Sequence, residues 1–107
     1  MASIKMMQGD SYVVFIDLTL NGQKLTPDIA DDVEICIGEV MRMTFSGGTV
    51  GYDLATERWY IRPTQAETIA LEPDTYNAVA RIKIGDDVKG INIGRLIITE
   101  TEGEEVI

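Results

Sequence analysis

Apolar and polar residues alternate along much of this chain, and the alternation is most regular between residues 76 and 84. Apolar residues fall on one side of that segment and polar residues on the other, with only Val79 out of pattern: Tyr76, Ala78, Ala80, Ile82 and Ile84 against Asn77, Arg81 and Lys83. Successive side chains of a strand point to opposite faces. The pattern therefore predicts a strand with one buried and one solvated face.

Shorter segments of strand character precede and follow it, separated by turn signals such as Asn21-Gly22 and Ser46-Gly47-Gly48. We count about seven or eight short strands, with turn signals about every 8–12 residues. The segments lie at residues 1–7, 11–20, 33–37 with an extended continuation at 40–45, 49–53, 59–62, 76–84, 88–92 and 94–99. This pattern predicts an all-β protein, an antiparallel immunoglobulin-like sandwich, with a small barrel as the alternative fold.

One short helical turn is expected near residues 64–69. Thr64 and Glu67 have the spacing of a capping box, in which each side chain bonds to the backbone amide of the other residue. Pro63 marks the end of the preceding strand, because proline donates no ladder hydrogen bond. Glu72-Pro73-Asp74 then supplies a tight turn into the next strand.

The chain length and the net charge limit the domain organisation and the kinds of binding partner. The 107 residues predict one domain over residues 1–99, followed by an acidic tail at residues 100–107. The net charge of −9, from 9 basic and 18 acidic residues, disfavours binding to nucleic acid or to an anionic membrane surface. The first residues contain no apolar signal-peptide core, and no run approaches the roughly 20 apolar residues of a membrane span.

The residue types in the sequence give little support for a catalytic function. The sequence has no histidine, the usual general base and commonest metal ligand. Cys36 lies in an apolar run and is expected to be a buried, inert thiol. The acidic clusters at residues 28–32 and 86–87 lack the spacing of a calcium loop, so we interpret them as solvated turns. We predict no enzyme, cofactor or metal site; a hydrolase with two paired carboxylates stays open as an alternative.

Apolar residues on nominally solvated faces indicate a function through surface contacts. Val13 and Phe15 lie on the solvated side of the 11–20 strand, so part of this face is expected to be covered by another element or a neighbouring subunit. Tyr60 and Arg62 alternate with core positions and are candidates for an exposed patch. The predicted interaction surface comprises Val13, Phe15, Tyr60, Arg62, Val106 and Ile107.

The aromatic residues allow two interpretations. Trp59, Tyr60, Tyr52 and Tyr76 can form a sugar-stacking platform, as in carbohydrate-binding sandwiches. The preferred interpretation makes Trp59 the core tryptophan and packs Tyr76 near the turn, with its hydroxyl bonded back to the backbone.

Several motifs follow one another in a recognisable order: Gln8-Gly9-Asp10-Ser11-Tyr12, a loop from Asn21 to Asp32, a V-E-I-x-I strand at Val33–Ile37, I-R-P-T-Q-A-E-T at Ile61–Thr68, and Pro73-Asp74-Thr75-Tyr76. This order resembles the immunoglobulin-like domain of phage baseplate upper proteins. The likeness covers nearly the whole chain and departs at Asp74, where glycine is usual.

The resemblance implies a structural or adaptor protein of a phage or prophage tail or baseplate. Such a protein is made in the bacterial cytoplasm, is not secreted by a signal peptide, and becomes a component of the virion. Its expected partners are other tail or baseplate proteins and further copies of itself as a homo-oligomer, with no nucleic acid and no membrane. A carbohydrate- or receptor-binding module is the alternative function.

Overall fold

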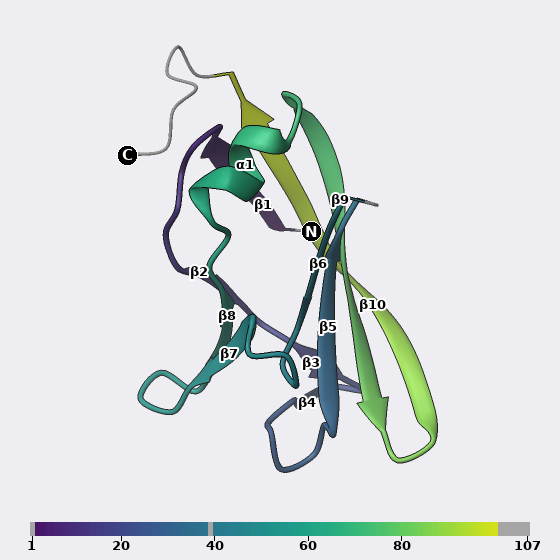
Figure 1. The fold of residues 1–107 in the computed structure, drawn as a ribbon. Helices are drawn as coiled ribbons and strands as arrows, with labels where there is room; N and C mark the ends of the chain where they lie inside the picture. The colour runs from purple at the N-terminus through teal and green to yellow at the C-terminus, as the bar shows by residue number, and fades with distance from the viewer. Residues whose placement is uncertain (1, 39, 101–107) are drawn as a thin grey trace.

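The computed structural model describes residues 2–38 and 40–100 and confirms an all-β sandwich (Figure 1). One sheet has five strands in the order β1-β10-β9-β5-β6, the other has three in the order β2-β8-β7, and β3 and β4 form a separate small hairpin. The elements are β1 (Ala2–Met7), β2 (Val14–Ile16), β3 (Thr19–Leu20), β4 (Gln23–Lys24), β5 (Asp32–Ile37), β6 (Met41–Thr44), β7 (Val50–Asp53), β8 (Arg58–Ile61), α1 (Gln65–Ala70), β9 (Asp74–Ile84) and β10 (Asp87–Thr99).

The strand order is that of an immunoglobulin-type sandwich. With letters assigned along the chain, β2-β8-β7 corresponds to the B-E-D sheet, and β10-β9-β5-β6 corresponds to strands G, F, C and C′. Apolar side chains from the inner faces of both sheets form one buried cluster between them. The core therefore lies where the alternation of the sequence predicts it.

The first strand departs from the expected antiparallel pattern. β1 pairs with β10 in parallel, with Ala2 opposite Gly94 and Met7 opposite Thr99, and this is the one parallel pair among the described strands. No tight turn joins these two strands, so hairpin geometry does not set their relative direction. Met6, only 1% exposed, lies on the inner face of β1.

Two of the expected strands have different limits. The predicted strand at residues 11–20 is interrupted, because the chain leaves β2 after Ile16 and enters the β3–β4 hairpin. Asn21 and Gly22 close this hairpin, both with the positive φ that their turn signal predicts. The segments at residues 88–92 and 94–99 are one strand, β10, with an irregularity in pairing between Asn92 and Gly94.

The predicted capping box at the start of α1 is confirmed. The amide of Glu67 donates to Thr64 Oγ1 at 3.1 Å, and the amide of Thr64 donates to Glu67 Oε1 at 2.9 Å. Two backbone donors that the first helical turn leaves without helix partners are thereby satisfied.

Replacing Thr64 with alanine should lower the free energy of unfolding by about 1 kcal/mol, because the Glu67 amide loses its side-chain acceptor. Chemical denaturation monitored by circular dichroism measures the change. Glu67→Gln is the matched control, since its amide oxygen can still accept from the Thr64 amide. A larger loss for this control than for Thr64→Ala would contradict the assignment.

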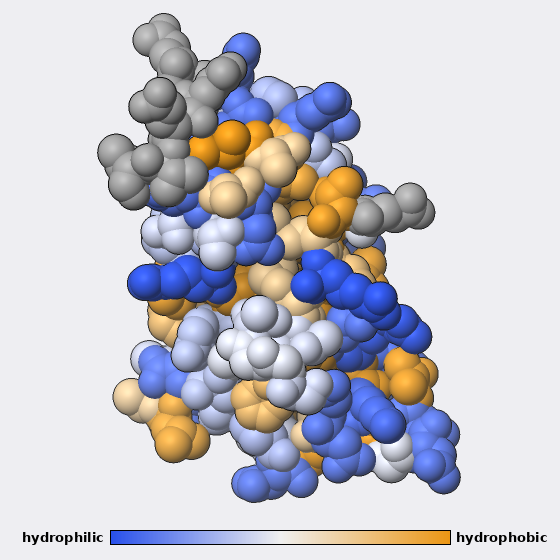
Figure 2. Space-filling view, viewed as in Figure 1, coloured by the Kyte–Doolittle hydropathy of each residue, from blue (hydrophilic) through white to orange (hydrophobic). Residues whose placement is uncertain are grey.

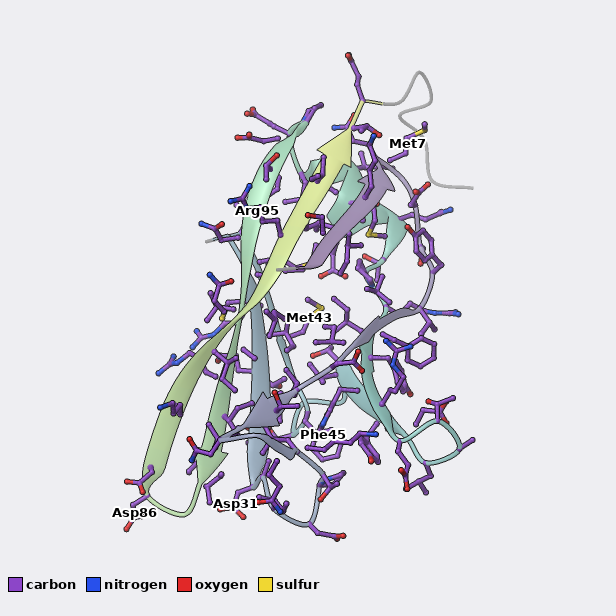
Figure 3. The ribbon with its side chains drawn as sticks, turned by 180° about the vertical axis from the view of Figure 1, so that it is seen from behind. Met7, Asp31, Met43, Phe45, Asp86 and Arg95 are labelled. Carbon is purple, nitrogen blue, oxygen red and sulfur yellow. The ribbon has the colours of Figure 1, made fainter. Side chains whose placement is uncertain are left out.

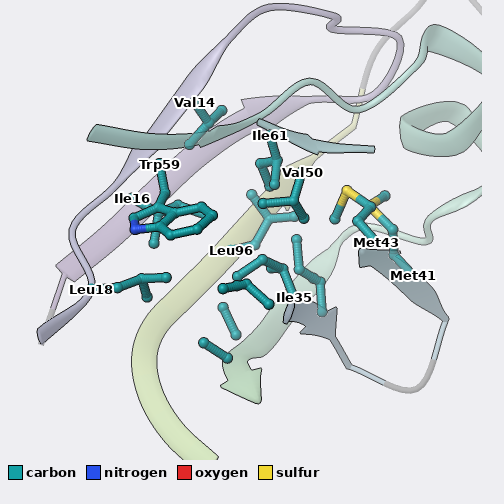
Figure 4. Close-up of a cluster of buried hydrophobic side chains, with 14 of the residues drawn as sticks. Val14, Ile16, Leu18, Ile35, Met41, Met43, Val50, Trp59, Ile61 and Leu96 are labelled. Carbon is teal, nitrogen blue, oxygen red and sulfur yellow. The ribbon is translucent and has the colours of Figure 1, made fainter. Parts of the chain in front are cut away.

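The predicted roles of Trp59 and Tyr76 are also confirmed. Trp59 is 1% exposed and lies among the apolar side chains of both sheets (Figure 4). The hydroxyl of Tyr76 donates to the backbone oxygen of Glu72 at 2.6 Å, across the turn that precedes β9. This bond is the tyrosine corner found near the start of strand F in immunoglobulin-type sandwiches.

Candidate functional site

The outer face of the three-stranded sheet brings together four of the six residues that the sequence singled out. Val14 and Ile16 of β2 point into the core, so Val13 and Phe15 lie on the opposite side. On β8, Trp59 and Ile61 are buried, and Tyr60 and Arg62, the residue directly after the strand, alternate with them. Phe15 stands directly opposite Tyr60 in the antiparallel register, so residues distant in sequence form one surface.

A shallow hollow of about 750 Å³ lies on this face, and we call it the outer hollow. It is lined by Val13, Phe15, Tyr52, Asp53, Leu54, Tyr60 and Arg62. Phe15 is 37% exposed and Leu54 is 84% exposed. In the space-filling view, apolar surface is scattered among charged side chains, with an apolar tip at the β7–β8 turn (Figure 2).

The floor of the outer hollow depends on a glycine. The Tyr60 ring lies directly over Gly51 of β7, and a Cβ atom on residue 51 would collide with the end of that ring. Phe15 meets Tyr60 edge to face from the other side, with 6.3 Å between the ring centroids and an interplanar angle of 71°. Gly51 and Phe15 therefore fix where the tyrosine ring lies on the sheet.

Arg58 completes the face, and the sequence reasoning did not single it out. Its Nε donates to Asp17 Oδ1 at 3.0 Å, and its guanidinium carbon lies 4.8 Å from the centre of the Phe15 ring. This contact is a cation–π interaction reinforced by an ion pair. Alternation along β8 places Arg58 on the same side as Tyr60 and Arg62, so the sequence did contain the signal.

The remaining predictions for this site have different outcomes. Val106 and Ile107 lie outside the described residues. A platform of Trp59, Tyr60, Tyr52 and Tyr76 is wrong, because Trp59 is buried and packs edge to face against Tyr52 at 5.0 Å between ring centroids. Burial, more than nearby acids, raises the pKa of the Tyr52 hydroxyl. The aromatic pair that reaches the outer face is Phe15 with Tyr60.

Two carboxylates share a second, smaller hollow on the outer face of the five-stranded sheet. Glu34 accepts hydrogen bonds from Arg42 Nε at 2.8 Å and Arg81 Nη1 at 3.3 Å, and the bond from Arg42 is the main cause of its lowered pKa. Burial raises the pKa of Asp32, but hydrogen bonds led by that from the Ser46 amide outweigh it and the net pKa is lowered. Both carboxylates are suited to ion pairing rather than to proton donation.

Cys36 differs in part from its predicted environment. It is half-buried rather than buried and lies on the same outer face as Glu34, to which its thiol donates at 3.2 Å. Burial, followed by this contact, raises the pKa of the thiol. A thiol with a raised pKa stays protonated, which agrees with the inert character expected from the sequence.

The acidic turns show ordinary turn chemistry. Asp31 and Asp86 lie in different loops at one end of the molecule (Figure 3). Asp31 Oδ2 accepts from the Gly85 amide at 2.6 Å and so links these two loops. In residues 2–38 and 40–100, no three acidic, cysteine or histidine side chains lie close enough together to hold a metal ion. Within the same residues, no helix has the length and apolar character required to cross a membrane.

The lowered pKa of Glu34 leads to a pH-dependent prediction. A carboxyl group whose pKa is lower in the folded protein stabilises it at pH values above its unfolded pKa, about 4.3. Glu34→Gln should therefore be less stable than the wild type at pH 7. The difference should shrink as the pH falls and vanish once Glu34 is protonated in the folded protein. Urea unfolding at several pH values measures this; a pH-independent difference would refute the electrostatic origin.

Comparisons with protein-family models, with characterised proteins and with solved structures found no match for this chain. The likeness to the baseplate domain therefore stays a prediction from the sequence.

Proposed function

We propose that this protein is a structural adaptor that joins other proteins through the outer face of its three-stranded sheet, and that it acts in a phage or prophage tail or baseplate. One observation supports the adaptor role most directly. Val13, Phe15, Tyr60 and Arg62, selected from the sequence as interaction candidates, line one shared hollow. The tail or baseplate setting rests on the order of sequence motifs.

The composition of this face suits protein recognition. Aromatic residues and arginine are enriched in protein interfaces and carry much of their binding energy. Phe15 and Tyr60 offer partly exposed rings of limited conformational freedom, because each is packed against the other. Arg58 is already paired with Asp17, whereas Arg62, directly after β8, forms no ion pair with the described residues.

The double substitution of Val13 and Phe15 with serine should leave a folded monomer and weaken self-association or partner binding by at least about tenfold. Loss of one well-packed interface anchor costs about 1.4 kcal/mol or more, which corresponds to that factor. Analytical ultracentrifugation measures self-association. A control in which Met7 and Val88 become serine removes two exposed apolar residues from the other sheet. Equal association of the two double variants would refute the assignment of this face.

Gly51→Ala offers a milder test of the same face. The added methyl group displaces only the far end of the Tyr60 side chain, so we expect the fold to persist while the outer hollow changes shape. Binding that survives both this change and Tyr60→Ala would show that the tyrosine is not an anchor.

The tail or baseplate setting has a separate test. If the setting is correct, mass spectrometry of particles purified after prophage induction should detect this chain at a fixed ratio to tail proteins. Intact particles that lack the chain while the host cytoplasm contains it would exclude the virion setting and leave the adaptor face to be tested independently.

Carbohydrate or receptor binding is the second candidate, favoured by the Phe15–Tyr60 pair on the outer face. A glycan-array screen of the wild type and of Tyr60→Ala separates the two functions. Saturable glycan binding that disappears in the variant would favour this second function over the adaptor role.

A further inference from the structure

A second cavity lies between the two sheets and is distinct from the outer hollow. It has a volume of about 190 Å³, and we call it the inner cavity. Its walls include Val14 and Ile61 from the three-stranded sheet and Ile35 and Leu96 from the five-stranded sheet, which face one another across the core (Figure 4). Ala78 and Gly94 also line it.

The inner cavity lies where two small residues of neighbouring strands meet. Ala78 of β9 and Gly94 of β10 are register partners, and both are buried. On β10, the next inward position carries the larger side chain of Leu96, which is 2% exposed. Gly94 has a φ of 145°, which L side chains rarely adopt. This backbone conformation therefore disfavours a larger residue at position 94.

An opening leads from the inner cavity to the surface. Several of its lining residues are partly or fully exposed: Phe15, Asp17, Arg58, Ile93 and Arg95. They lie on β2 or beside it, on β8 and on β10, where strands of the two sheets line one side of the inner cavity. The Arg58–Asp17 ion pair lies at this opening. Because it carries one positive and one negative charge, it favours the entry of an uncharged molecule over that of an ion.

The chemistry of the walls specifies an apolar ligand. The deep part of the inner cavity is formed by aliphatic side chains, such as Ile35 at 0% and Ile61 at 2% exposure. Within the described residues, no buried side-chain nitrogen or oxygen lacks a hydrogen-bond partner. These residues therefore offer no unpaired buried polar side chain to a polar ligand. An apolar cavity of about 150 Å³ in another protein stays dry and binds benzene or xenon. The inner cavity is larger than that reference.

We propose that the inner cavity is a binding site for a compact, uncharged apolar molecule of the size of benzene or toluene, which enters between β2 and β10. Selectivity depends on size and shape, since the deep walls offer no polar anchor. Phe15 lines both the outer hollow and the inner cavity, but other residues line only one of them. Tyr60 lines only the outer hollow and Ala78 lines only the inner cavity, so the two sites can be altered separately.

Toluene is the probe for the first experiment, with the full chain labelled at isoleucine and leucine methyl groups for nuclear magnetic resonance. We expect saturable shifts at Ile35, Ile61 and Leu96. Ala78→Val, which adds two methyl groups inside the inner cavity, should weaken toluene binding at least tenfold. Val79→Ile, which enlarges the neighbouring residue on the outer face of β9, and Tyr60→Ala should both leave binding within about twofold of the wild type.

Three outcomes would overturn the proposal: no saturable shifts, equal affinity for the wild type and Ala78→Val, or shifts that depend on Tyr60 and therefore report the outer hollow. A measurement on the wild type avoids any folding defect of the cavity variant. A crystal under xenon pressure should contain xenon between Ala78 of the five-stranded sheet and Ile61 of the three-stranded sheet, and its absence there would also refute the site.

Discussion

Trp59→Ala should lower the free energy of unfolding by about 3–5 kcal/mol, the range for removing a large aromatic residue from a core. Trp59 is 1% exposed, so its whole ring would leave a void that the surrounding strands can fill only in part. The ring also packs edge to face against Phe45 at 5.1 Å and Tyr52 at 5.0 Å between centroids. The variant therefore loses packing on two sides as well as buried apolar area.

A hydrogen bond adds to the expected loss. Trp59 Nε1 donates to the backbone oxygen of Leu25 at 3.0 Å, inside the core. Without the indole, that oxygen keeps its desolvation cost and loses its partner. Small domains have total stabilities of about 5–15 kcal/mol, so the variant should be close to unfolded at 37 °C.

Urea denaturation of Trp59→Ala, followed by circular dichroism, measures the loss directly. Trp59→Phe is the control that keeps an aromatic ring but removes the indole donor, and its loss should be clearly smaller. A loss below about 1 kcal/mol for the alanine variant would show that the surrounding side chains close the void.

Thr68→Val should cost about 2–4 kcal/mol, although the two side chains have nearly the same shape. Thr68 is 0% exposed, and its Oγ1 accepts from the Gly9 amide at 2.9 Å and donates to the Asp10 oxygen at 2.9 Å. Valine can do neither, and each backbone group left without a partner in a part-buried site costs about 1–3 kcal/mol. These two bonds attach α1 to the loop after β1.

Thr68→Ser is the control for this prediction, because it keeps the hydroxyl and removes only a methyl group. We expect it to lose less stability than the valine variant. Hydrogen exchange gives a local readout, since the Gly9 amide should exchange faster in Thr68→Val than in Thr68→Ser. Equal exchange in the two variants would mean that the threonine does not hold this loop.

Local patterns in the sequence were sufficient to predict much of the fold. The alternation from Tyr76 to Ile84 predicts β9, whose inward residues Ala78, Ala80 and Ile82 are buried. The spacing of Thr64 and Glu67 predicts the cap of α1. These features depend on residues within a few positions of one another, for which side-chain direction follows from backbone geometry alone.

The sequence predicted individual residues of the candidate site, but not how they come together. Alternation indicates that Phe15 and Tyr60 face away from the core, but nothing in the sequence pairs β2 with β8. That pairing, which sets Phe15 opposite Tyr60 and lets the ring lie over Gly51, is a contact between segments far apart in the chain. Which strand pairs with β2 is determined by how the two sheets bury their apolar faces together.

The sequence by itself determined the all-β class, the turns, the capped helical turn and which side of each strand is apolar, because these follow from local periodicity and turn chemistry. Only the tertiary structure decided that β1 runs parallel to β10, that Arg58 joins the outer face, and that Ala78 meets Gly94 at the inner cavity. Each of these is a contact between residues distant in the chain. Cooperative packing of the two sheets fixes such contacts, and local residue preferences do not.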